Sequence, residues 1–394
     1  MRRSELSSRL RELEQAGLIR SRRRIEGPQG PHLRVDGATY LAFCSNDYLG
    51  LASHPALADA ARRALDDFGV GAGASAHICG HTRVHEALEQ RLARFVRLPR
   101  ALHFSTGYMA NLGVLPSLAG PGDVIFSDRL NHASLIDAAR LSRADVVVYP
   151  HGDVEALGLQ MSEQADRSKL IVTDAVFSMD GDLAPLPQLL ELCEHHDAWL
   201  VVDDAHGFGV LGENGAGSLS HWGLSSERIV YMGTLGKAAG VFGAFVAADA
   251  DVIEWLLQRA RTYMFTTSTP PVLAAALLAA LDVIETESWR RRHLTALIER
   301  VHAGLSGLGW RLLPSATAIQ PLIIGDNSGA MSLMDSLRHS GIWVPAIRPP
   351  TVPPGTARLR ISLSAAHSDQ DIDRLLNRLR AVAPGQPMAD RPST

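Results

Sequence analysis

The residue with the greatest chemical potential is Lys237, one of only two lysines in the chain, the other being Lys169. Subtracting these two from the 38 basic residues leaves 36 arginines. An arginine keeps its proton in a protein, whereas a lysine amine can become neutral and attack a carbonyl group to form a Schiff base. Because glycines frame Lys237 in the stretch YMGTLGKAAG (231–240), we predict that it is a covalent catalyst. The alternative is compositional drift, which leaves a few lysines anywhere.

The elements that must position this lysine are short, apolar, β-branched runs separated by segments of helix length. We predict strands at 101–106, 123–128, 145–150, 169–178, 199–206, 228–233 and 243–248. Such strands, alternating with helices, indicate an α/β fold with a mostly parallel sheet of seven strands, covered on both faces. Ligands bind outside the carboxyl ends of such strands. These ends carry Ser105, Thr106 and Gly107, then Ser127 and Asp128, Ser178, Met179 and Asp180, Asp203, Asp204 and His206, and Thr234 and Lys237.

Two carboxylates follow one of these strands in the sequence DDAH (203–206). Asp203 and Asp204 alternate across the strand, so we expect only one of them to face the crevice. A buried carboxylate there would keep the ring nitrogen of pyridoxal 5'-phosphate (PLP) protonated and make the ring an electron sink. His206 would hydrogen-bond the ring hydroxyl or order Asp203. The alternatives are an ordinary strand end and a satisfied polar histidine.

Other residues suit the remaining parts of such a cofactor. Gly107 and Tyr108 stand at a strand-to-helix junction, where backbone N–H groups and a helix N-terminus favour a phosphate. Ser178 and Thr234 would add hydroxyl donors, and His132, in DRLNHASLIDA, would lay its imidazole over the ring. The alternative for His132 is a polar residue at a helix N-terminus.

A glycine-rich loop, GVGAGASAHICG (69–80), contains a loose GxGxxA pattern. A dinucleotide site needs a strand before the glycines, whereas we predict a helix over 55–68, closed by Gly69, so we reject that site and expect a flexible loop. His77, His81 and His85 are spaced four apart, as on a metal-binding helix. Gly80 interrupts that helix, and Thr82 is the predicted N-cap of the next one, which disfavours a metal site.

Composition excludes several classes of protein. The 394 residues suffice for two or three domains, and 46% hydrophobic with 20% charged residues is an ordinary globular balance. A net charge of −4 makes nucleic acid an unexpected partner. Three scattered cysteines suit a reducing compartment. Without a signal peptide or an apolar run of about 18 residues, we expect a cytoplasmic, non-membrane protein.

The chain divides into four predicted parts. An N-terminal helix and strand segment covers 1–45, and its amphipathic helix ends in an arginine cluster at Arg20, Arg22, Arg23 and Arg24. A large domain covers 46–285 and a small C-terminal α+β domain covers 286–384. The Pro-rich tail 385–394 is expected to be disordered.

Taken together, these segments resemble the α-oxoamine synthases, which are fold-type I PLP transferases related to aspartate aminotransferase. The resemblance rests on SNDYLG (45–50), STGYMAN (105–111), DRLNHASL (128–135), VFSMDGD (176–182), VDDAHGFGVLGENGAGS (202–218), GTLGKAAG (233–240), TTSTPP (266–271) and AIRPPTVPPGTARLRIS (346–362). Two departures concern loop geometry: GAGASAHICG is less glycine-rich than usual, and Ala239 replaces a bulkier residue.

The resemblance implies a role for each matching position. Lys237 would carry PLP as a Schiff base and then move the substrate α-proton, while His132 would stack on the ring. Asp203 would bind the pyridine nitrogen. Cofactor contacts would also come from Gly107, Tyr108, Ser178, His206, Thr234 and, across a homodimer interface, Thr266 or Thr267. Substrate contacts would come from Arg20, His132, Thr351 and Arg360, with Arg360 gripping the amino-acid carboxylate.

Within the family the chain is most similar to members that condense L-alanine with a pimeloyl thioester, on coenzyme A or acyl carrier protein, and release CO₂ in biotin synthesis. The first alternative is another α-oxoamine synthase that uses glycine or serine with a different acyl thioester. A second is a metal-dependent hydrolase built on the three histidines and the 203–206 strand end. A third is a non-catalytic scaffold, which the retained lysine disfavours.

Overall fold

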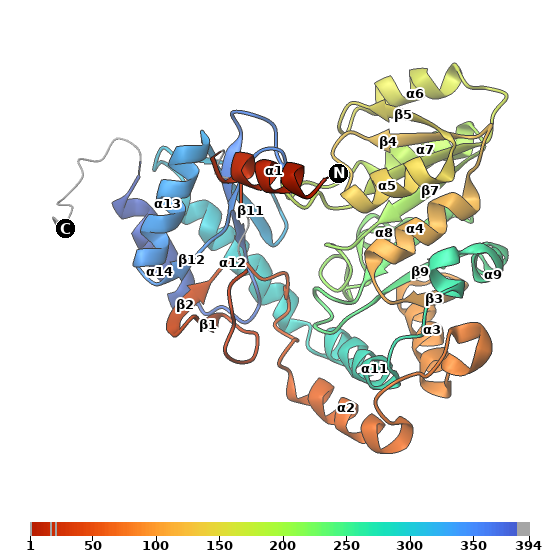
Figure 1. Cartoon of the computed structure of the whole chain (residues 1–394), viewed down its shortest axis with the longest axis horizontal. Coiled ribbons are helices and arrows are strands. Elements are labelled where there is room, and N and C mark those ends of the chain that lie inside the picture. Colours follow the sequence, from red (N-terminus) through yellow and green to blue (C-terminus); the bar gives the residue numbers. More distant parts are fainter. Residues whose placement is uncertain (1, 16–17, 20–21, 384–394) are drawn as a thin grey trace.

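The computed structural model describes residues 2–15, 18–19 and 22–383. Arg20 and the predicted tail 385–394 therefore lie outside the described residues. The molecule has two lobes (Figure 1): the larger holds the long central sheet, and the smaller gathers the C-terminal elements with the first strands of the chain. Among the described residues, no helix is long and apolar enough to span a bilayer.

The secondary structure alternates between helices and short strands. The helices are α1 (Arg3–Gln15), α2 (Pro55–Phe68), α3 (Arg83–Val96), α4 (Gly107–Leu118), α5 (Ala133–Ser142), α6 (Val154–Ser162), α7 (Leu186–His195), α8 (Ser218–Trp222), α9 (Ala250–Arg259), α10 (Arg261–Met264), α11 (Pro271–Thr286), α12 (Trp289–Leu305), α13 (Asn327–His339) and α14 (Asp369–Ala381). The strands are β1 (His32–Val35), β2 (Ala38–Ala42), β3 (Arg100–Phe104), β4 (Val124–Asp128), β5 (Asp145–Tyr149), β6 (Lys169–Asp174), β7 (Ala198–Asp203), β8 (Ile229–Thr234), β9 (Ala244–Ala248), β10 (Arg311–Leu312), β11 (Ile319–Gly325), β12 (Ile342–Trp343), β13 (Ala346–Ile347) and β14 (Ala357–Ser362).

The central sheet contains the seven predicted strands in the order β3-β9-β8-β7-β6-β4-β5. Strand β9 pairs antiparallel with both of its neighbours, and the pairs among β8, β7, β6, β4 and β5 are parallel. The prediction of a mostly parallel seven-stranded sheet is therefore confirmed. The carboxyl ends of the parallel strands meet at one edge, which is where the candidate site lies.

Two strands end earlier than the sequence pattern predicts. β6 ends at Asp174 rather than at 178, because Phe177 and Gly181 form a turn in which each N–H meets a carbonyl of the turn itself. β7 ends at Asp203 rather than at 206, because the N–H groups of Gly207 and Phe208 bond the carbonyl of Asp204. Past Asp174 the apolar residues Ala175, Val176 and Phe177 continue the strand pattern, and neither turn was visible in the sequence.

Two separate groups of apolar side chains cover the two faces of this sheet. One face packs against α4, α5 and α9 and includes Val201. The opposite face packs against α3, α7 and α11 and includes Val202. Neighbouring residues of β7 thus point to opposite faces, as a pleated strand requires. By the same alternation Asp203 lies on the face of Val201 and Asp204 lies on the face of Val202.

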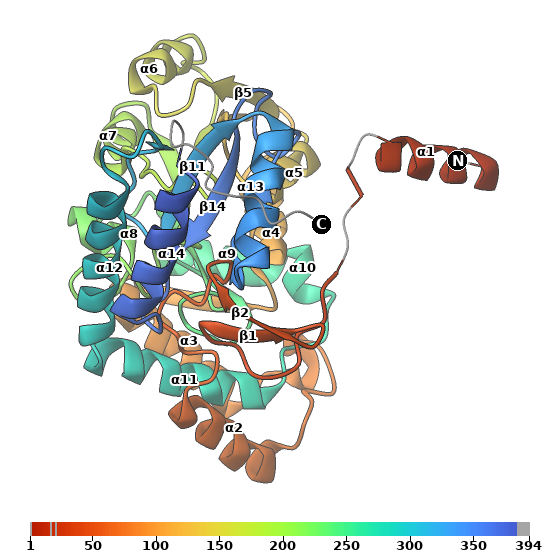
Figure 2. The ribbon, with the colours of Figure 1, turned by 90° about the vertical axis from the view of Figure 1, so that its left-hand side faces the viewer.

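The smaller lobe brings together segments from both ends of the chain. β1 and β2 form an antiparallel hairpin, and β2 also pairs in parallel with β12. Beside them lies a four-stranded sheet in the order β10-β11-β14-β13, which fits the predicted α+β character of the C-terminal part. Figure 2 shows this lobe in front, with α1 standing away from the body of the molecule. The numerical domain boundaries 1–45, 46–285 and 286–384 stay a prediction.

The glycine-rich loop follows a helix, as predicted. Helix α2 covers Pro55–Phe68, and Gly69 closes it with a positive φ of 71°. The second half of the loop is not irregular, however, since residues Ala76–Gly80 form one π-helical turn. Gly80 is required there, because a Cβ at this position would lie 2.0 Å from the carbonyl oxygen of Ala74. The sequence analysis did not predict this turn, and the flexibility of the loop stays a prediction.

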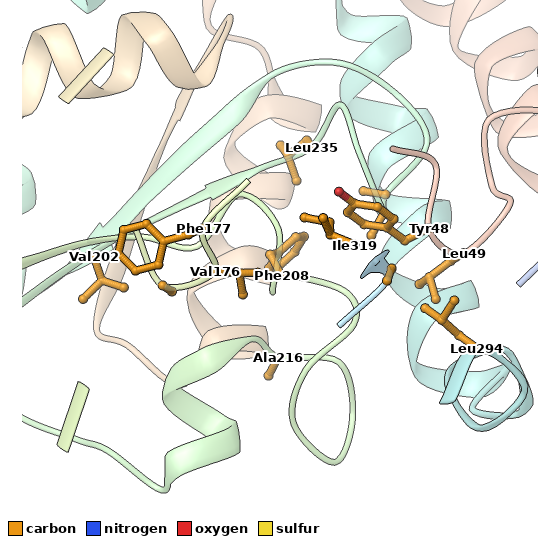
Figure 3. Packing of buried hydrophobic residues seen from close by; sticks show 14 of the residues in the cluster. Tyr48, Leu49, Val176, Phe177, Val202, Phe208, Ala216, Leu235, Leu294 and Ile319 are labelled. Atoms are coloured by element: carbon orange, nitrogen blue, oxygen red, sulfur yellow. The ribbon is translucent and has the colours of Figure 1, made fainter. Parts of the chain in front are cut away.

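The two lobes are joined by one continuous apolar core. Figure 3 shows Tyr48, Leu235 and Ile319, which come from three different parts of the chain, in the same cluster. Tyr48 is 1% exposed, and its side chain makes polar contacts through its hydroxyl group. The segment that carries it, residues 45–50, is thereby held against the carboxyl edge of the central sheet.

Candidate active site

Lys237 lies in a tight loop between β8 and β9. The N–H of Leu235 donates to the carbonyl of Gly243, and the N–H of Gly240 donates to the carbonyl of Lys237. Gly240 has a φ of 71°, and a Cβ there would lie 2.5 Å from the backbone of Leu51. Glycine is therefore needed to close the loop. Burial lowers the pKa of the Lys237 amine from 10.5 to about 8, so a neutral amine is accessible near physiological pH.

His206 is the nearest hydrogen-bonding partner of this amine. Its Nε2 lies 2.8 Å from Lys237 Nζ, and its Nδ1 lies 2.6 Å from the hydroxyl oxygen of Tyr48. Burial is the largest of several causes that hold the pKa of His206 well below 6.5, with Lys237 and Arg360 adding to it. His206 is therefore a neutral imidazole with one donor and one acceptor nitrogen.

Asp203 and Asp204 face opposite sides of β7, as expected. The Asp203 carboxylate accepts hydrogen bonds from Asn111 Nδ2, at 2.7 Å, and from the N–H of Ala205, at 3.0 Å. Asp204 instead accepts from the hydroxyl of Tyr231, at 2.7 Å, and from the N–H of Ser218, at 2.6 Å. Burial raises the pKa of Asp204 to about 7. Asp203 thus lies on the α4 and α5 side of the sheet with His132 and Lys237.

His132 is the N-cap of α5. Its Nδ1 accepts the N–H of Ser134 at 3.2 Å and lies 2.7 Å from the Ser134 hydroxyl. The Ser134 hydroxyl also accepts from Asn111 Nδ2, which links His132 to the carboxylate of Asp203. Burial is the main cause that lowers the pKa of His132. The capping role and the proposed stacking role are compatible, because capping uses Nδ1 and leaves the ring face free.

The start of α4 offers unused donors. Thr106 caps the helix by accepting the N–H of Met109 at 3.1 Å, whereas the N–H groups of Gly107 and Tyr108 meet no acceptor within the described ranges. A Cβ on Gly107 would stand 4.0 Å from the hydroxyl oxygen of Thr234, so these two positions are neighbours. Two free N–H groups at a helix N-terminus, with a hydroxyl beside them, suit an anion.

Arg360 reaches the site from β14 in the smaller lobe. Its Nε donates to the carbonyl of Ser178 at 2.6 Å, and its Nη1 donates to Ser362 Oγ at 2.6 Å and to Asn46 Oδ1 at 3.2 Å. Although Arg360 is only 6% exposed, no carboxylate of the described chain pairs with it. Two residues away, buried Arg358 does pair with Asp180. A buried guanidinium without a counter-ion is suited to an anionic ligand.

Three predicted contact residues in the described part of the chain are not brought to the lysine by any hydrogen bond. Thr351 is exposed in a turn, where its N–H donates to the carbonyl of Arg348. Thr266 lines a small cavity with His103 and Ser105, and Thr267 is exposed. Arg20 lies outside the described residues. The assigned roles of all these positions stay predictions.

The three histidines of the metal hypothesis have separate partners. His77 stacks edge-on against Tyr263, while His81 pairs with Glu89 at 3.1 Å. His85 Nδ1 caps α3 at Thr82, and His85 Nε2 lies 2.9 Å from the carbonyl oxygen of Thr269. Across the described part of the chain, no group of three or more His, Cys, Asp or Glu residues is arranged to hold a metal ion.

Several contacts in the site come from residues to which the sequence alone assigned no role. Asn111, Ser134, Tyr48 and Asn46 complete the hydrogen bonds of His132, Asp203, His206 and Arg360. One signal was available: Asn111 is a polar residue in the apolar helix sequence GYMANLGVL. A buried amide in such a helix needs polar partners, and this could have pointed to Asp203.

Sequence comparison places the chain among known enzymes. The family model for class I and II aminotransferases matches residues 38–379. The 8-amino-7-oxononanoate synthase of Herminiimonas arsenicoxydans is 59% identical over 387 residues, covering 97% of this chain and 100% of that protein. The enzyme of the same name from Nitrosomonas europaea is also 59% identical, covering 96% of this chain and 99% of that protein.

Solved structures show the same fold. The serine palmitoyltransferase of Sphingomonas wittichii superposes with a TM-score of 0.90 at 32% identity, covering 97% of this chain and 98% of that chain. The S. paucimobilis enzyme, solved with PLP and myriocin bound, gives 0.90 at 31% identity, with 96% of each chain covered. An 8-amino-7-oxononanoate synthase from Francisella tularensis gives 0.76 at 31% identity, covering 86% of this chain and 97% of that chain.

Proposed function

We propose that this chain, which belongs to the class I and II aminotransferase family and within it to the 8-amino-7-oxononanoate synthases, joins L-alanine to a pimeloyl thioester with loss of CO₂. The chemistry is carried by one observation: the Lys237 amine lies in a closed loop at the carboxyl edge of the sheet, with its Nζ 2.8 Å from His206 Nε2. Burial lowers the pKa of this amine to about 8. The proposed substrates are those of the 8-amino-7-oxononanoate synthases, because relatives of that name match almost the whole length of this chain.

The residues around Lys237 fit PLP. The free N–H groups of Gly107 and Tyr108 are donors that suit a phosphate. The Thr234 hydroxyl beside them donates to the Gly243 carbonyl at 3.2 Å and would turn from it to join them. The buried Asp203 carboxylate suits a protonated ring nitrogen, and Lys237 suits the carbonyl carbon. His132 would lie over the ring, and Ser178 and His206 would contact the ring hydroxyl. The bound cofactor supplies an electron sink for the pair of electrons left when alanine loses its α-proton.

Arg360 is the proposed carboxylate site for alanine. A buried arginine presents a planar fork of donors that matches two carboxylate oxygens. Its Nε is held by the Ser178 carbonyl, so the guanidinium is oriented before a ligand arrives. Binding there would direct the α-carbon toward Lys237, whose neutral amine removes the α-proton and later returns a proton to the product.

The acyl donor is proposed to contact Arg20 and Thr351. The chain carries a basic cluster at Arg20, Arg22, Arg23 and Arg24, which would attract a phosphorylated nucleotide or an acidic acyl carrier protein. Coenzyme A and acyl carrier protein are both retained as carriers. The nearest competing function is another α-oxoamine synthase acting on glycine or serine, such as the serine palmitoyltransferases that share the fold.

A homodimer with shared active sites is part of the proposal. Val70, Ile78 and Phe265 are 75%, 78% and 70% exposed, and the segments that carry them are joined by a hydrogen bond from the Ser268 N–H to the Ala74 carbonyl. Large apolar side chains that are exposed on neighbouring segments favour a protein partner. A second copy would bring Thr266 or Thr267 to the neighbouring phosphate. Cytoplasmic location is proposed with it, supported by three free cysteines.

Product analysis tests this function. Purified enzyme loaded with PLP is incubated with pimeloyl-CoA or pimeloyl-acyl carrier protein and, in turn, with alanine, glycine or serine, and products are identified by mass spectrometry. We expect 8-amino-7-oxononanoate and one CO₂ per turnover with alanine alone. Lys237→Ala should abolish turnover and the absorbance of the protein-bound cofactor. If the enzyme prefers serine or glycine, the proposed function is wrong and the chain is another α-oxoamine synthase.

A further inference from the structure

A line of hydrogen bonds connects Lys237 to Arg360 across the junction of the two lobes. Lys237 Nζ lies 2.8 Å from His206 Nε2, and His206 Nδ1 lies 2.6 Å from the Tyr48 hydroxyl. The Tyr48 hydroxyl donates to Asn46 Oδ1 at 3.1 Å. Arg360 closes the line by donating to Asn46 Oδ1 at 3.2 Å and to the Tyr48 oxygen at 3.4 Å.

The direction of the protons follows from the Arg360 end of this line. A guanidinium has donors only, so the oxygens of Asn46 and Tyr48 that face it must accept. Because the Tyr48 oxygen accepts from Arg360, its own hydrogen points either to Asn46 Oδ1 or to His206 Nδ1. In the second case the two oxygens of Tyr48 and Asn46 would face each other at 3.1 Å without a hydrogen between them. The first arrangement satisfies every contact.

With the Tyr48 hydrogen on Asn46, the short contact to His206 needs a donor from the histidine. His206 Nδ1 must then carry the proton, and Nε2 must be the acceptor. The positions of the heavy atoms therefore select one neutral tautomer of His206. Because Tyr48 is 1% exposed, bulk water does not compete with its hydroxyl oxygen as the acceptor for His206 Nδ1–H.

We propose that Tyr48 is a positioning residue, which with Asn46 holds His206 as the Nδ1–H tautomer so that Nε2 accepts an N–H of Lys237 and leaves the amine lone pair free. The opposite tautomer would donate Nε2–H to that lone pair and block it as a nucleophile or base. This inference rests on the proposed role of Lys237 as the attacking amine and proton carrier.

The same contacts connect substrate binding to the lysine. Arg360 shares its Nη1 and Nη2 donors between Ser362, Asn46 and Tyr48. The proposed carboxylate-binding residue is therefore in direct contact with the residues that hold His206, and through His206 with Lys237.

The test is Tyr48→Phe in the full-length protein. Phenylalanine keeps the ring in the core and removes only the hydroxyl. Cofactor-free proteins labelled with ¹⁵N-histidine are measured by NMR, with His206 assigned by its loss in His206→Asn. We expect the wild type to show protonated Nδ1 and unprotonated Nε2, and Tyr48→Phe to show a mixture of tautomers. In the loaded enzyme, kcat should fall by about tenfold or more, as for other supports of a reacting group.

The matched control is Tyr149→Phe, which removes another buried tyrosine hydroxyl, on the edge strand β5. It should keep the wild-type tautomer and kcat, and equal melting temperatures of all variants exclude unfolding. A wild-type His206 protonated at Nε2, or a Tyr48→Phe enzyme with the wild-type tautomer, overturns the proposal. Failure of the wild type to make product from alanine would instead count against the proposed function, since the NMR result does not depend on turnover.

Discussion

The two faces of strand β7 carry adjacent, equally buried aspartates whose surroundings differ in one respect. Asp203 is joined to Asn111, whose amide also bonds Ser134 beside His132, so its carboxylate belongs to a network that opens toward Lys237. The Asp204 carboxylate accepts hydrogen bonds from the Tyr231 hydroxyl and the Ser218 N–H, and neither of these residues belongs to the candidate site. Burial alone therefore does not mark a functional carboxylate. A functional carboxylate is instead identified by its hydrogen bonds to residues that face the reactive group, as Asp203 is linked to His132 beside Lys237.

Of the substitutions that test this difference between the two aspartates, Asp203→Asn is expected to have the largest effect on kcat. Loss of one partner of a buried ion pair costs about 3–5 kcal/mol. At 1.36 kcal/mol per decade, kcat should fall by roughly a hundred- to a few thousandfold, measured by product formation at saturating alanine. The melting temperature should change little, because Asn can keep the contact with Ala205 N–H. A variant with normal kcat would remove Asp203 from the proposed ring-nitrogen site.

The second-largest effect distinguishes two arginines of β14: Arg358, which pairs with Asp180, and Arg360, which pairs with no carboxylate of the described chain. Arg360→Lys replaces the fork by a point charge, and loss of a charged hydrogen bond costs about 1.5–3 kcal/mol. The KM for alanine should rise by roughly ten- to a hundredfold, with a smaller change in kcat, in steady-state assays. The control, Arg358→Lys, retains a charge beside Asp180 and should leave this KM unchanged. Equal effects of both variants would contradict the carboxylate role.

The third effect is the pH dependence of cofactor loading. The reacting form of Lys237 is the neutral amine, and its pKa is about 8. Below that pH most of the amine is protonated, so the rate of PLP uptake by cofactor-free enzyme should rise about fivefold from pH 7 to 8 and level off above pH 9. Stopped-flow absorbance measures it. A rate that keeps rising to pH 10 would mean that burial does not lower the pKa of this lysine.

The smallest effect is expected from Asp204→Asn. The folded pKa of Asp204, about 7, lies above the ordinary aspartate value, so the folded state binds the proton more tightly than the unfolded state does. Stability from this group is full below about pH 4 and is lost as the pH rises to 7. The variant should show a smaller fall in melting temperature between pH 5 and pH 8 than the wild type, while kcat stays within a few-fold. An unchanged pH slope would refute this.

Much of the fold was predictable because it rests on local patterns. The seven apolar runs are long and well separated, and Pro55, Thr82 and Gly69 mark helix ends by their own backbone chemistry. The position of Lys237 at a strand end was predictable for the same reason. Family resemblance added the roles of residues whose spacing carries no signal.

Other features depended on information that no single segment contains. Both faces of β7 are buried, so alternation showed that Asp203 and Asp204 diverge without showing which one faces the crevice. Two partners of the Tyr48 hydroxyl, His206 and Arg360, lie more than 150 positions away in the chain, and a propensity argument does not reach them. The early ends of β6 and β7 depended on turn hydrogen bonds that compete with a continuing strand.

The pairing of β2 with β12 has a consequence for synthesis of the enzyme. The chain places Asn46 and Tyr48 near its start and Arg360 near its end, and the strand pair Ala38–Ala42 with Ile342–Trp343 brings these regions together. A ribosome must therefore extend almost the entire polypeptide before the hairpin at the N-terminal end gains its third strand. The lysine loop can fold against the central sheet while translation is still under way, but the carboxylate site is assembled only when the last strands emerge.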